Sequence, residues 1–249
     1  MSFPQQFSVQ KVNVVNQSTA VTDAEVAKMV LALNVTLPTF VRDWNLTATQ
    51  VGVLSKTATL PTGSSNINVL IMDTTDISGT PAYHTLYSGT STVKVFAQTI
   101  LTAGGACLYE DTRTKPTVSQ VLCHEVLEAI ADAKCTSWFI NPTSGALYAS
   151  EIADPVDGNI KVVRLHDGTR VAVSDWVLPA WYDARNTVGP YNNLDTLSAP
   201  FALAPSGYAM ITSAGEVSYL YGSAVSDATK AYLLLSMRTL TRVAAVKGL

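Results

Sequence analysis

The feature that most constrains this chain is a histidine and two glutamates inside an otherwise apolar segment, residues 120–130 (QVLCHEVLEAI). His124 and Glu128 are four positions apart, so a helix would place both side chains on one face. Charged groups among hydrophobic neighbours are costly unless they are paired or bind a metal ion. The segment therefore predicts a buried helix over about 117–132 whose polar face lines a site.

The order of the remaining segments predicts an α+β fold in a single domain that covers residues 1–249. The expected architecture is a mixed sheet with the central helix against it, followed by a β-rich C-terminal half. Alternating or continuous apolar stretches indicate strands before this helix, at 8–16, 51–54, 67–72 and 92–99.

Two further helices are expected near the ends of the chain. The first begins after Thr22, and Pro38 is expected to kink or end it, because proline lacks the backbone N–H that a helix interior uses. The last covers about 226–243 and packs on the domain or on a partner. Its exposed face is expected to carry the basic residues Lys230, Arg238 and Arg242.

The chain is poor in charge. Charged residues make up 14% and hydrophobic residues 47%, whereas about 25% charged residues is usual. Such a surface is typical of a protein that buries part of itself against other subunits, or of a small secreted protein coated with Ser and Thr. The net charge of −3 and the scattered Lys and Arg argue against nucleic acid as a partner.

The three cysteines, Cys107, Cys123 and Cys135, leave an odd one in any disulfide scheme, and their spacing matches no zinc ribbon or redox pair. Reduced thiols are therefore expected. The N-terminus shows no signal-peptide pattern, and no apolar run approaches the roughly 18 residues of a membrane span. These features predict a protein that is cytoplasmic when made, without a membrane partner, or one that an assembly carries out of the cell.

The polar face of the central helix predicts a divalent metal site. The His124 imidazole and the Glu128 carboxylate would hold the ion, the ion would acidify a water, and Glu125 would take the proton as a general base. Glu151 lies in the densest acidic cluster of the chain, SEIADPVD at 150–157, and is the candidate third ligand.

Three more residues are candidates to support these ligands. Asp154 or Asp132 would orient His124 by accepting a hydrogen bond from its second ring nitrogen. His84, in AYHTLY, is either a histidine hydrogen-bonded beside a strand or a ligand or transition-state stabiliser.

Other notable residues receive structural roles first. Asp157 precedes Gly158 and is expected to form a turn, with calcium binding as a distant alternative, and His166 is expected at the surface of a hairpin turn. The aromatic residues Trp176, Trp181 and Tyr182 are expected to pack in the core. The alternative is that they line a cleft.

The helix HEVLE followed by EIAD resembles the gluzincin-type zincin metallopeptidases, which hold zinc with the two histidines of HExxH and the glutamate of a later ExxxD. Several stretches together also resemble a family of uncharacterised bacterial and phage proteins. This resemblance covers roughly residues 8–210 and implies a zincin-like fold and a phage or prophage origin. The stretches are AYH (82–84), KVFA (94–97), HEVLEAIAD (124–132), LYASEIADPVDG (147–158), VSDWVLPAWY (173–182), PFAL (200–203) and GY (207–208).

The chain departs from the zincin pattern at two points. Glu128 stands where the second histidine is usual, and the later motif is ExxD. The resemblance assigns the first ligand to His124, the base to Glu125, the second ligand to Glu128 and the third to Glu151. Such a set is more anionic than two histidines and a glutamate, so it would accept zinc but also manganese, calcium or iron. The additional carboxylate also donates more charge to the ion and weakens its Lewis acidity. Hydrolysis needs this acidity, so the replacement affects catalysis more than metal binding.

Two function hypotheses from different classes follow. The first is a zincin-like, divalent-metal-binding protein, with zinc as the expected metal, that acts as a metallopeptidase or amide hydrolase. The alternative is a virion structural or assembly protein, such as a capsid decoration or tail component, that keeps an inactive zincin scaffold without metal. Its partners would be other virion subunits or copies of itself. A carbohydrate- or surface-binding module that uses the aromatic residues at 176–182 has the least support.

Overall fold

The computed structural model of the chain describes residues 11–112, 115–235 and 242. The strands of the N-terminal half are β1 (Lys11–Asn16), β2 (Gln50–Leu54), β3 (Asn66–Met72), β4 (Ala82–Tyr87) and β5 (Thr90–Phe96). Those that follow are β6 (Trp138–Ile140), β7 (Leu147–Ala149), β8 (Ile160–Arg164), β9 (Arg170–Ser174), β10 (Tyr208–Ser213) and β11 (Glu216–Tyr221). The helices are α1 (Asp23–Asp43), α2 (Ala97–Thr102), α3 (Val118–Ala131) and α4 (Asp227–Leu235), with the short 3-10 helices η1 (Asp154–Val156) and η2 (Pro179–Tyr182).

A five-stranded mixed sheet in the order β2-β1-β3-β5-β4 forms one layer of the fold. Neighbouring strands are parallel except at the edge, where β4 runs antiparallel to β5. Val14 pairs with Val69, and Val69 pairs with Val93, so a row of buried valines crosses the sheet. This arrangement confirms the expected α+β class with a mixed sheet, but β4 was not among the expected strands.

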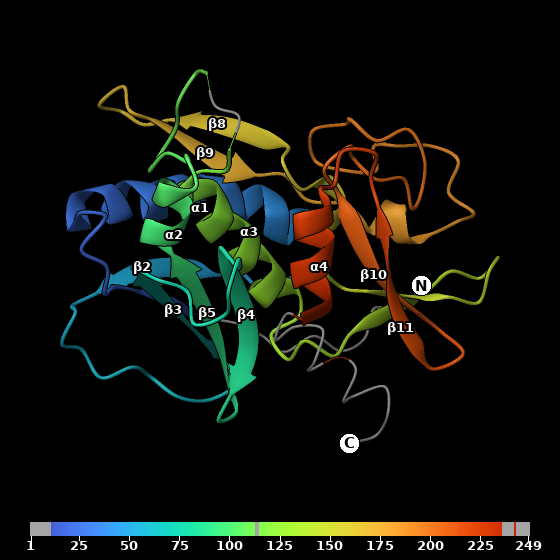
Figure 1. Cartoon of the computed structure of the whole chain (residues 1–249), viewed down its shortest axis with the longest axis horizontal. Coiled ribbons are helices and arrows are strands. Elements are labelled where there is room, and N and C mark those ends of the chain that lie inside the picture. The colour runs from blue at the N-terminus through green and yellow to red at the C-terminus, as the bar shows by residue number, and fades with distance from the viewer. Residues whose placement is uncertain (1–10, 113–114, 236–241, 243–249) are drawn as a thin grey trace.

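The second half of the chain is rich in β structure, as expected. A four-stranded antiparallel sheet has the order β11-β10-β7-β6, and β8 and β9 form a separate hairpin. Helices α1, α2 and α3 lie between the five-stranded sheet and this hairpin, whereas β10, β11 and α4 lie at one side (Figure 1). The chain therefore places α3 at the centre, with β structure on both sides of it.

Helix α1 starts with a capping box. The Thr22 hydroxyl accepts a hydrogen bond from the Glu25 backbone N–H at 3.2 Å, and the Glu25 carboxylate accepts one from the Thr22 backbone N–H at 2.8 Å. Of the two effects expected of Pro38, a kink or the end of the helix, the second is wrong, because α1 continues to Asp43. Phe40, beyond the proline, is fully buried, and packing of this last turn offsets the hydrogen bond that proline removes.

By length and composition alone, α1 is apolar enough to cross a membrane, which differs from the expectation that no segment would be. Its inner face packs in the hydrophobic core of the domain, through residues such as Met29, Leu33 and Leu37. In this structure the apolar length of α1 serves core packing.

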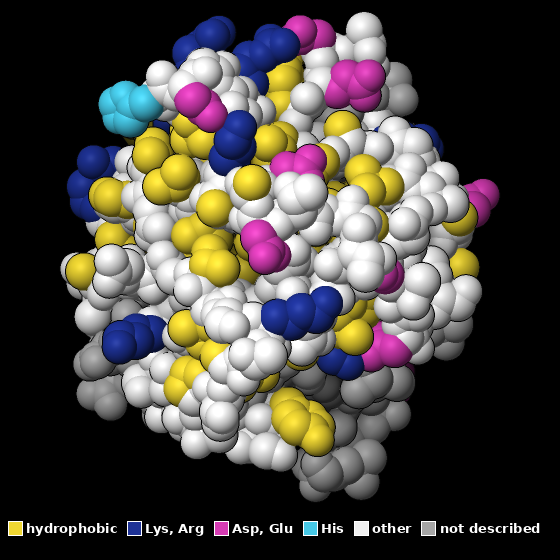
Figure 2. All heavy atoms as spheres, turned by 90° about the vertical axis from the view of Figure 1, so that its left-hand side faces the viewer, with side chains coloured by type: hydrophobic (Ala, Val, Ile, Leu, Met, Phe, Trp, Pro, Cys, Tyr) yellow, Lys and Arg dark blue, Asp and Glu magenta, His cyan; other side chains and the backbone are white. Residues whose placement is uncertain are grey.

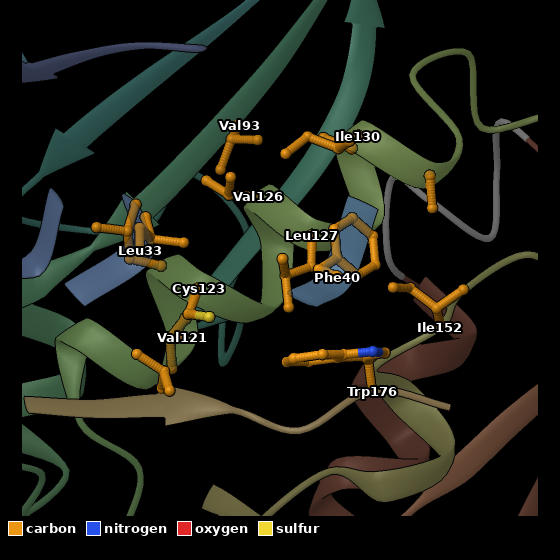
Figure 3. Close-up of a cluster of buried hydrophobic side chains, with 14 of the residues drawn as sticks. Leu33, Phe40, Val93, Val121, Cys123, Val126, Leu127, Ile130, Ile152 and Trp176 are labelled. Atoms are coloured by element: carbon orange, nitrogen blue, oxygen red, sulfur yellow. The ribbon is translucent and has the colours of Figure 1, made fainter. Parts of the chain in front are cut away.

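The core is built around α3 (Figure 3). Val126 of α3 lies next to Val93 of the sheet, and Trp176 and Ile152 lie on the other side of the helix (Figure 3). Phe40 of α1 meets Trp176 edge-to-face, with ring centroids 5.6 Å apart. The apolar residues of α3 thus hold the helix from several directions and fix where its polar side chains lie.

The expected C-terminal helix falls only in part on the described residues. Helix α4 covers Asp227–Leu235, which agrees with the first half of the expected 226–243 helix. Residues 236–241 and 243, with Arg238 among them, lie outside the described residues. Arg242 is described, and its side chain is fully buried rather than exposed as expected.

Candidate metal centre

Helix α3 is buried along its whole length, including its histidine and both glutamates. Thr117 caps its start, because the hydroxyl accepts a hydrogen bond from the Gln120 backbone N–H at 3.0 Å. The expected boundaries of 117–132 are therefore confirmed to within one residue at each end. Because the helix crosses the core, its polar side chains must find partners within the protein.

The first group of converging ligand atoms contains His124. Its Nε2 atom lies 3.0 Å from Oδ1 of Asp154 and 3.4 Å from Oε1 of Glu128. These three residues offer ligand atoms that all lie within 4.8 Å of one another. The other ring nitrogen, Nδ1, lies 4.0 Å from Oδ1 of Asp157, which is too long for a hydrogen bond but places a carboxylate on that side of the ring.

The second group contains His84, which β4 places beside α3. The Nδ1 atom of His84 lies 3.0 Å from Oε2 of Glu125 and 3.7 Å from Oε2 of Glu128. These three side chains also bring ligand atoms within 4.8 Å of one another, and all are buried. His84 was expected as a supporting residue, and the structure brings it into direct contact with the expected base.

Glu128 belongs to both groups. Its Oε1 atom faces His124 and accepts hydrogen bonds from the backbone N–H groups of Ala153 and Asp154, at 3.1 and 3.3 Å. Its Oε2 atom faces His84. A fully buried carboxylate thus stands between two imidazoles with one oxygen toward each.

Glu151 and Asp132 lie elsewhere than expected. Arg242 donates from Nε to Oε1 of Glu151 and from a terminal nitrogen to Oδ2 of Asp132, both at 2.9 Å. It also donates to the Ser137 carbonyl at 3.0 Å. Glu151 is therefore paired with a guanidinium instead of joining His124 and Glu128, and Asp132 orients this arginine instead of His124. Asp154 contacts His124 as expected, with a hydrogen bond of 3.0 Å between its Oδ1 and Nε2 of the histidine, and it thereby lies where Glu151 was expected.

Five carboxylates around α3, here called the buried acid cluster, are each at most 4% exposed. They are Glu125, Glu128, Asp132, Glu151 and Asp154. Arg242 is the one buried guanidinium among the described residues. Buried carboxylates thus outnumber buried cationic side chains among the described residues, and buried charge is costly unless it is paired or binds a metal ion.

The neighbouring carboxylates change the pKa values of both histidines. Burial lowers the pKa of His124, but the Glu128 and Asp154 carboxylates outweigh it and hold that pKa well above its ordinary value. Burial also lowers the pKa of His84, whereas Cys135 and the Glu151 and Glu125 carboxylates raise it well above normal.

A cavity of about 320 Å³ adjoins the first group. His124 and Glu125 line it from α3, together with Asp157 and with Tyr208 of β10. A molecule in this cavity would therefore meet the imidazole of the first group and the carboxylate of the expected base. The residues that line it come from separate parts of the chain, which local sequence patterns do not connect.

The remaining candidates take the structural roles expected of them. His166 is exposed, and Trp176, Trp181 and Tyr182 are each at most 1% exposed within the core. The Tyr182 hydroxyl donates a hydrogen bond to the Ala149 carbonyl at 3.1 Å. The three cysteines are free thiols, in agreement with the expectation.

Asp157 and Arg242 are the site residues that the sequence did not identify. Asp157 has the signal of a turn former, and Arg242 has that of an exposed helix residue, so neither pattern pointed to the site. Comparisons of the chain with protein-family models, with curated proteins and with solved structures found no match.

Proposed function

We propose that this protein binds a divalent cation at His124, Glu128 and Asp154 and hydrolyses an amide bond in the adjoining cavity, with Glu125 as the general base. The observation that carries the proposal is the convergence of one imidazole and two carboxylates at the wall of a cavity, next to a further carboxylate. The five-stranded sheet with its antiparallel edge and the helix against it support the zincin-like interpretation.

The chemistry of the donors suits such an ion. One nitrogen and two carboxylate oxygens fit zinc, and they also fit manganese or iron. A divalent cation supplies Lewis acidity, which lowers the pKa of a bound water and polarises a carbonyl. Asp157, 4.0 Å from Nδ1 of His124, adds negative charge beside the imidazole.

Glu125 is placed to move a proton. It lines the cavity directly beside His124 in sequence, and His84 lies 3.0 Å from one of its oxygens. This contact fixes the orientation of the carboxylate inside the core, while the cavity gives it access to a small molecule. A positioned carboxylate of this kind acts as general base for attack on a carbonyl.

The change Glu125→Gln is expected to lower turnover by roughly 10²–10⁴-fold, because the amide cannot accept a proton at neutral pH. Turnover would be followed on labelled casein and on a set of short fluorogenic peptides. Cation binding at the His124 group should persist, as measured by plasma mass spectrometry of the dialysed protein.

Glu110→Gln, on an exposed glutamate, is the matched control and should leave turnover unchanged. Turnover of the Glu125 variant at the wild-type rate, with its fold intact, would contradict the assignment of the base.

A subunit role in a larger assembly is the second candidate, and the surface favours it. Leu31 and Val35, four residues apart on α1, are 55% and 62% exposed. On the face in Figure 2, hydrophobic side chains lie among scattered charged ones. If assembly is the function, the protein should self-associate in sedimentation experiments, and Leu31→Ser with Val35→Ser should abolish association. A wild-type protein that stays monomeric at high concentration would argue against this role.

A further inference from the structure

The His84 group is a second set of ligand atoms, beside the one used by the proposed function. Its members come from the edge strand β4 and from α3, and side-chain exposure is 0% for His84, 5% for Glu125 and 0% for Glu128. Ordinary hydrogen bonding accounts for only one of the short distances, the 3.0 Å contact between His84 and Glu125. The 3.7 Å distance between Nδ1 of His84 and Oε2 of Glu128 is too long for a hydrogen bond.

An independent observation concerns the other nitrogen of His84. Nε2 is buried and has no hydrogen-bond partner among the described residues, and Oε2 of Glu151 lies 3.6 Å from it. Buried polar atoms nearly always have a partner, so such an atom in a native core calls for an explanation. A cation bound through Nδ1, beside Glu125 and Glu128, would leave the ring proton on Nε2, facing the carboxylate of Glu151, and a carboxylate behind the second nitrogen is typical of metal-binding histidines.

The charge of the described residues points in the same direction. The five carboxylates of the buried acid cluster lie with one buried guanidinium, Arg242, and with two imidazoles, which are neutral when they bind a metal ion. Surroundings so rich in buried carboxylates favour a cation.

We infer that a second divalent cation binds at His84, Glu125 and Glu128, with the Glu128 carboxylate bridging the two cations. The inference rests on the proposed function for the first cation and deepens it to a two-metal site. Glu128 already directs one oxygen to each histidine, which is what a bridging carboxylate requires. Glu125 has two carboxylate oxygens, so one that binds the second cation leaves the other to accept a proton.

A pair of cations sharing a carboxylate is suited to hydrolysis. Two-metal sites hold both the attacking oxygen and the oxygen of the scissile group, and they occur in aminopeptidases as well as in phosphatases and nucleases. The free amino terminus of a peptide would reach such a site through the cavity beside His124 and Glu125. The cavity thus sets which groups of a substrate meet the cations.

The test is titration of the full-length apoprotein with Mn²⁺, with stoichiometry read from equilibrium dialysis and coupling read from electron paramagnetic resonance. The wild type is expected to bind about two equivalents and to show an exchange-coupled signal, because a shared carboxylate couples the two ions. His84→Gln and Asp154→Asn should each reduce binding to about one equivalent with an uncoupled spectrum. His166→Gln, on the exposed histidine, should behave as the wild type.

The outcomes separate the two proposals. Suppose that the wild type binds one equivalent of Mn²⁺, which Asp154→Asn loses and His84→Gln keeps. This result would overturn the second cation and leave the proposed function intact. Two equivalents without exchange coupling would overturn the bridging role of Glu128. No binding by the wild type would overturn both proposals. The wild-type spectrum alone decides between one and two coupled ions if a variant fails to fold.

Discussion

Replacing Arg242 with methionine is expected to lower the free energy of unfolding by about 3–5 kcal/mol, as removal of one partner from a buried ion pair commonly does. The guanidinium is fully buried and donates to Glu151, to Asp132 and to the Ser137 carbonyl. Without it, two buried carboxylates lose their counter-charge, and methionine restores the volume but no hydrogen bond. Urea unfolding followed by tryptophan fluorescence would measure the loss.

Two further substitutions sharpen this test. Arg242→Lys keeps the charge, but one ammonium cannot reproduce the fork that holds three acceptors, so a smaller loss is expected. Arg185→Met removes an arginine that also contacts a carboxylate, Asp183, but with its side chain 70% exposed. This control should cost no more than about 1 kcal/mol. Equal effects of the two methionine substitutions would mean that the buried pairing contributes little to stability.

The local features of the site could be predicted from the sequence. The boundaries of α3 follow from Thr117 as a cap and from apolar residues at helical spacing, and both signals are contained in neighbouring residues. The placement of His124 and Glu128 on one helical face follows from the same periodicity. The fold class followed from the order of strands and helices along the chain.

The partners of α3 could not be predicted in the same way, because they depend on long-range packing. His84 reaches Glu125 across 41 positions, and Arg242 reaches Glu151 across 91. The choice of Asp154 over Glu151 beside His124 depends on how the chain turns into η1 after β7, and the two acids are only three positions apart in the sequence. Helical spacing at Arg242 indicated an exposed residue, but the charge of the cluster favours a buried one.

The same reasoning explains the first helix. Proline has a strong local tendency to end helices, and the sequence pattern was interpreted accordingly at Pro38. The residues after it, Phe40 and Trp44, are almost fully buried, and Trp44 donates a hydrogen bond to the Val177 carbonyl at 3.0 Å. Tertiary packing beyond a proline thus outweighs a local preference worth about 3 kcal/mol.

Glu128→Gln is expected to reverse the order of stability between variant and wild type when divalent cations are added. In a chelator, the variant should be at least as stable as the wild type, because the change removes one negative charge from the buried acid cluster. The glutamine carbonyl can still accept the hydrogen bonds that Ala153 and Asp154 donate to Oε1. The substitution therefore tests charge with little change of shape.

With cations present, the wild type should gain and the variant should not. At a free cation concentration of about 1,000 times the dissociation constant, binding at one site adds about 4 kcal/mol. For a chain of this size that corresponds to a rise in Tm of roughly 8–16 °C. Glutamine donates much less charge to an ion than glutamate, and as the residue shared by both ligand groups it would weaken both positions.

Thermal unfolding of the wild type, Glu128→Gln and the exposed control Glu110→Gln, each in chelator and in excess Mn²⁺ or Zn²⁺, would measure this reversal. The control should follow the wild type under both conditions, because Glu110 lies outside the cluster. A wild-type Tm that cations leave unchanged would mean that the cluster binds no divalent ion. A cation-dependent rise in Tm of equal size in Glu128→Gln would place the ion away from Glu128. A gain in stability that requires Glu128 as a ligand would disappear when that carboxylate is removed.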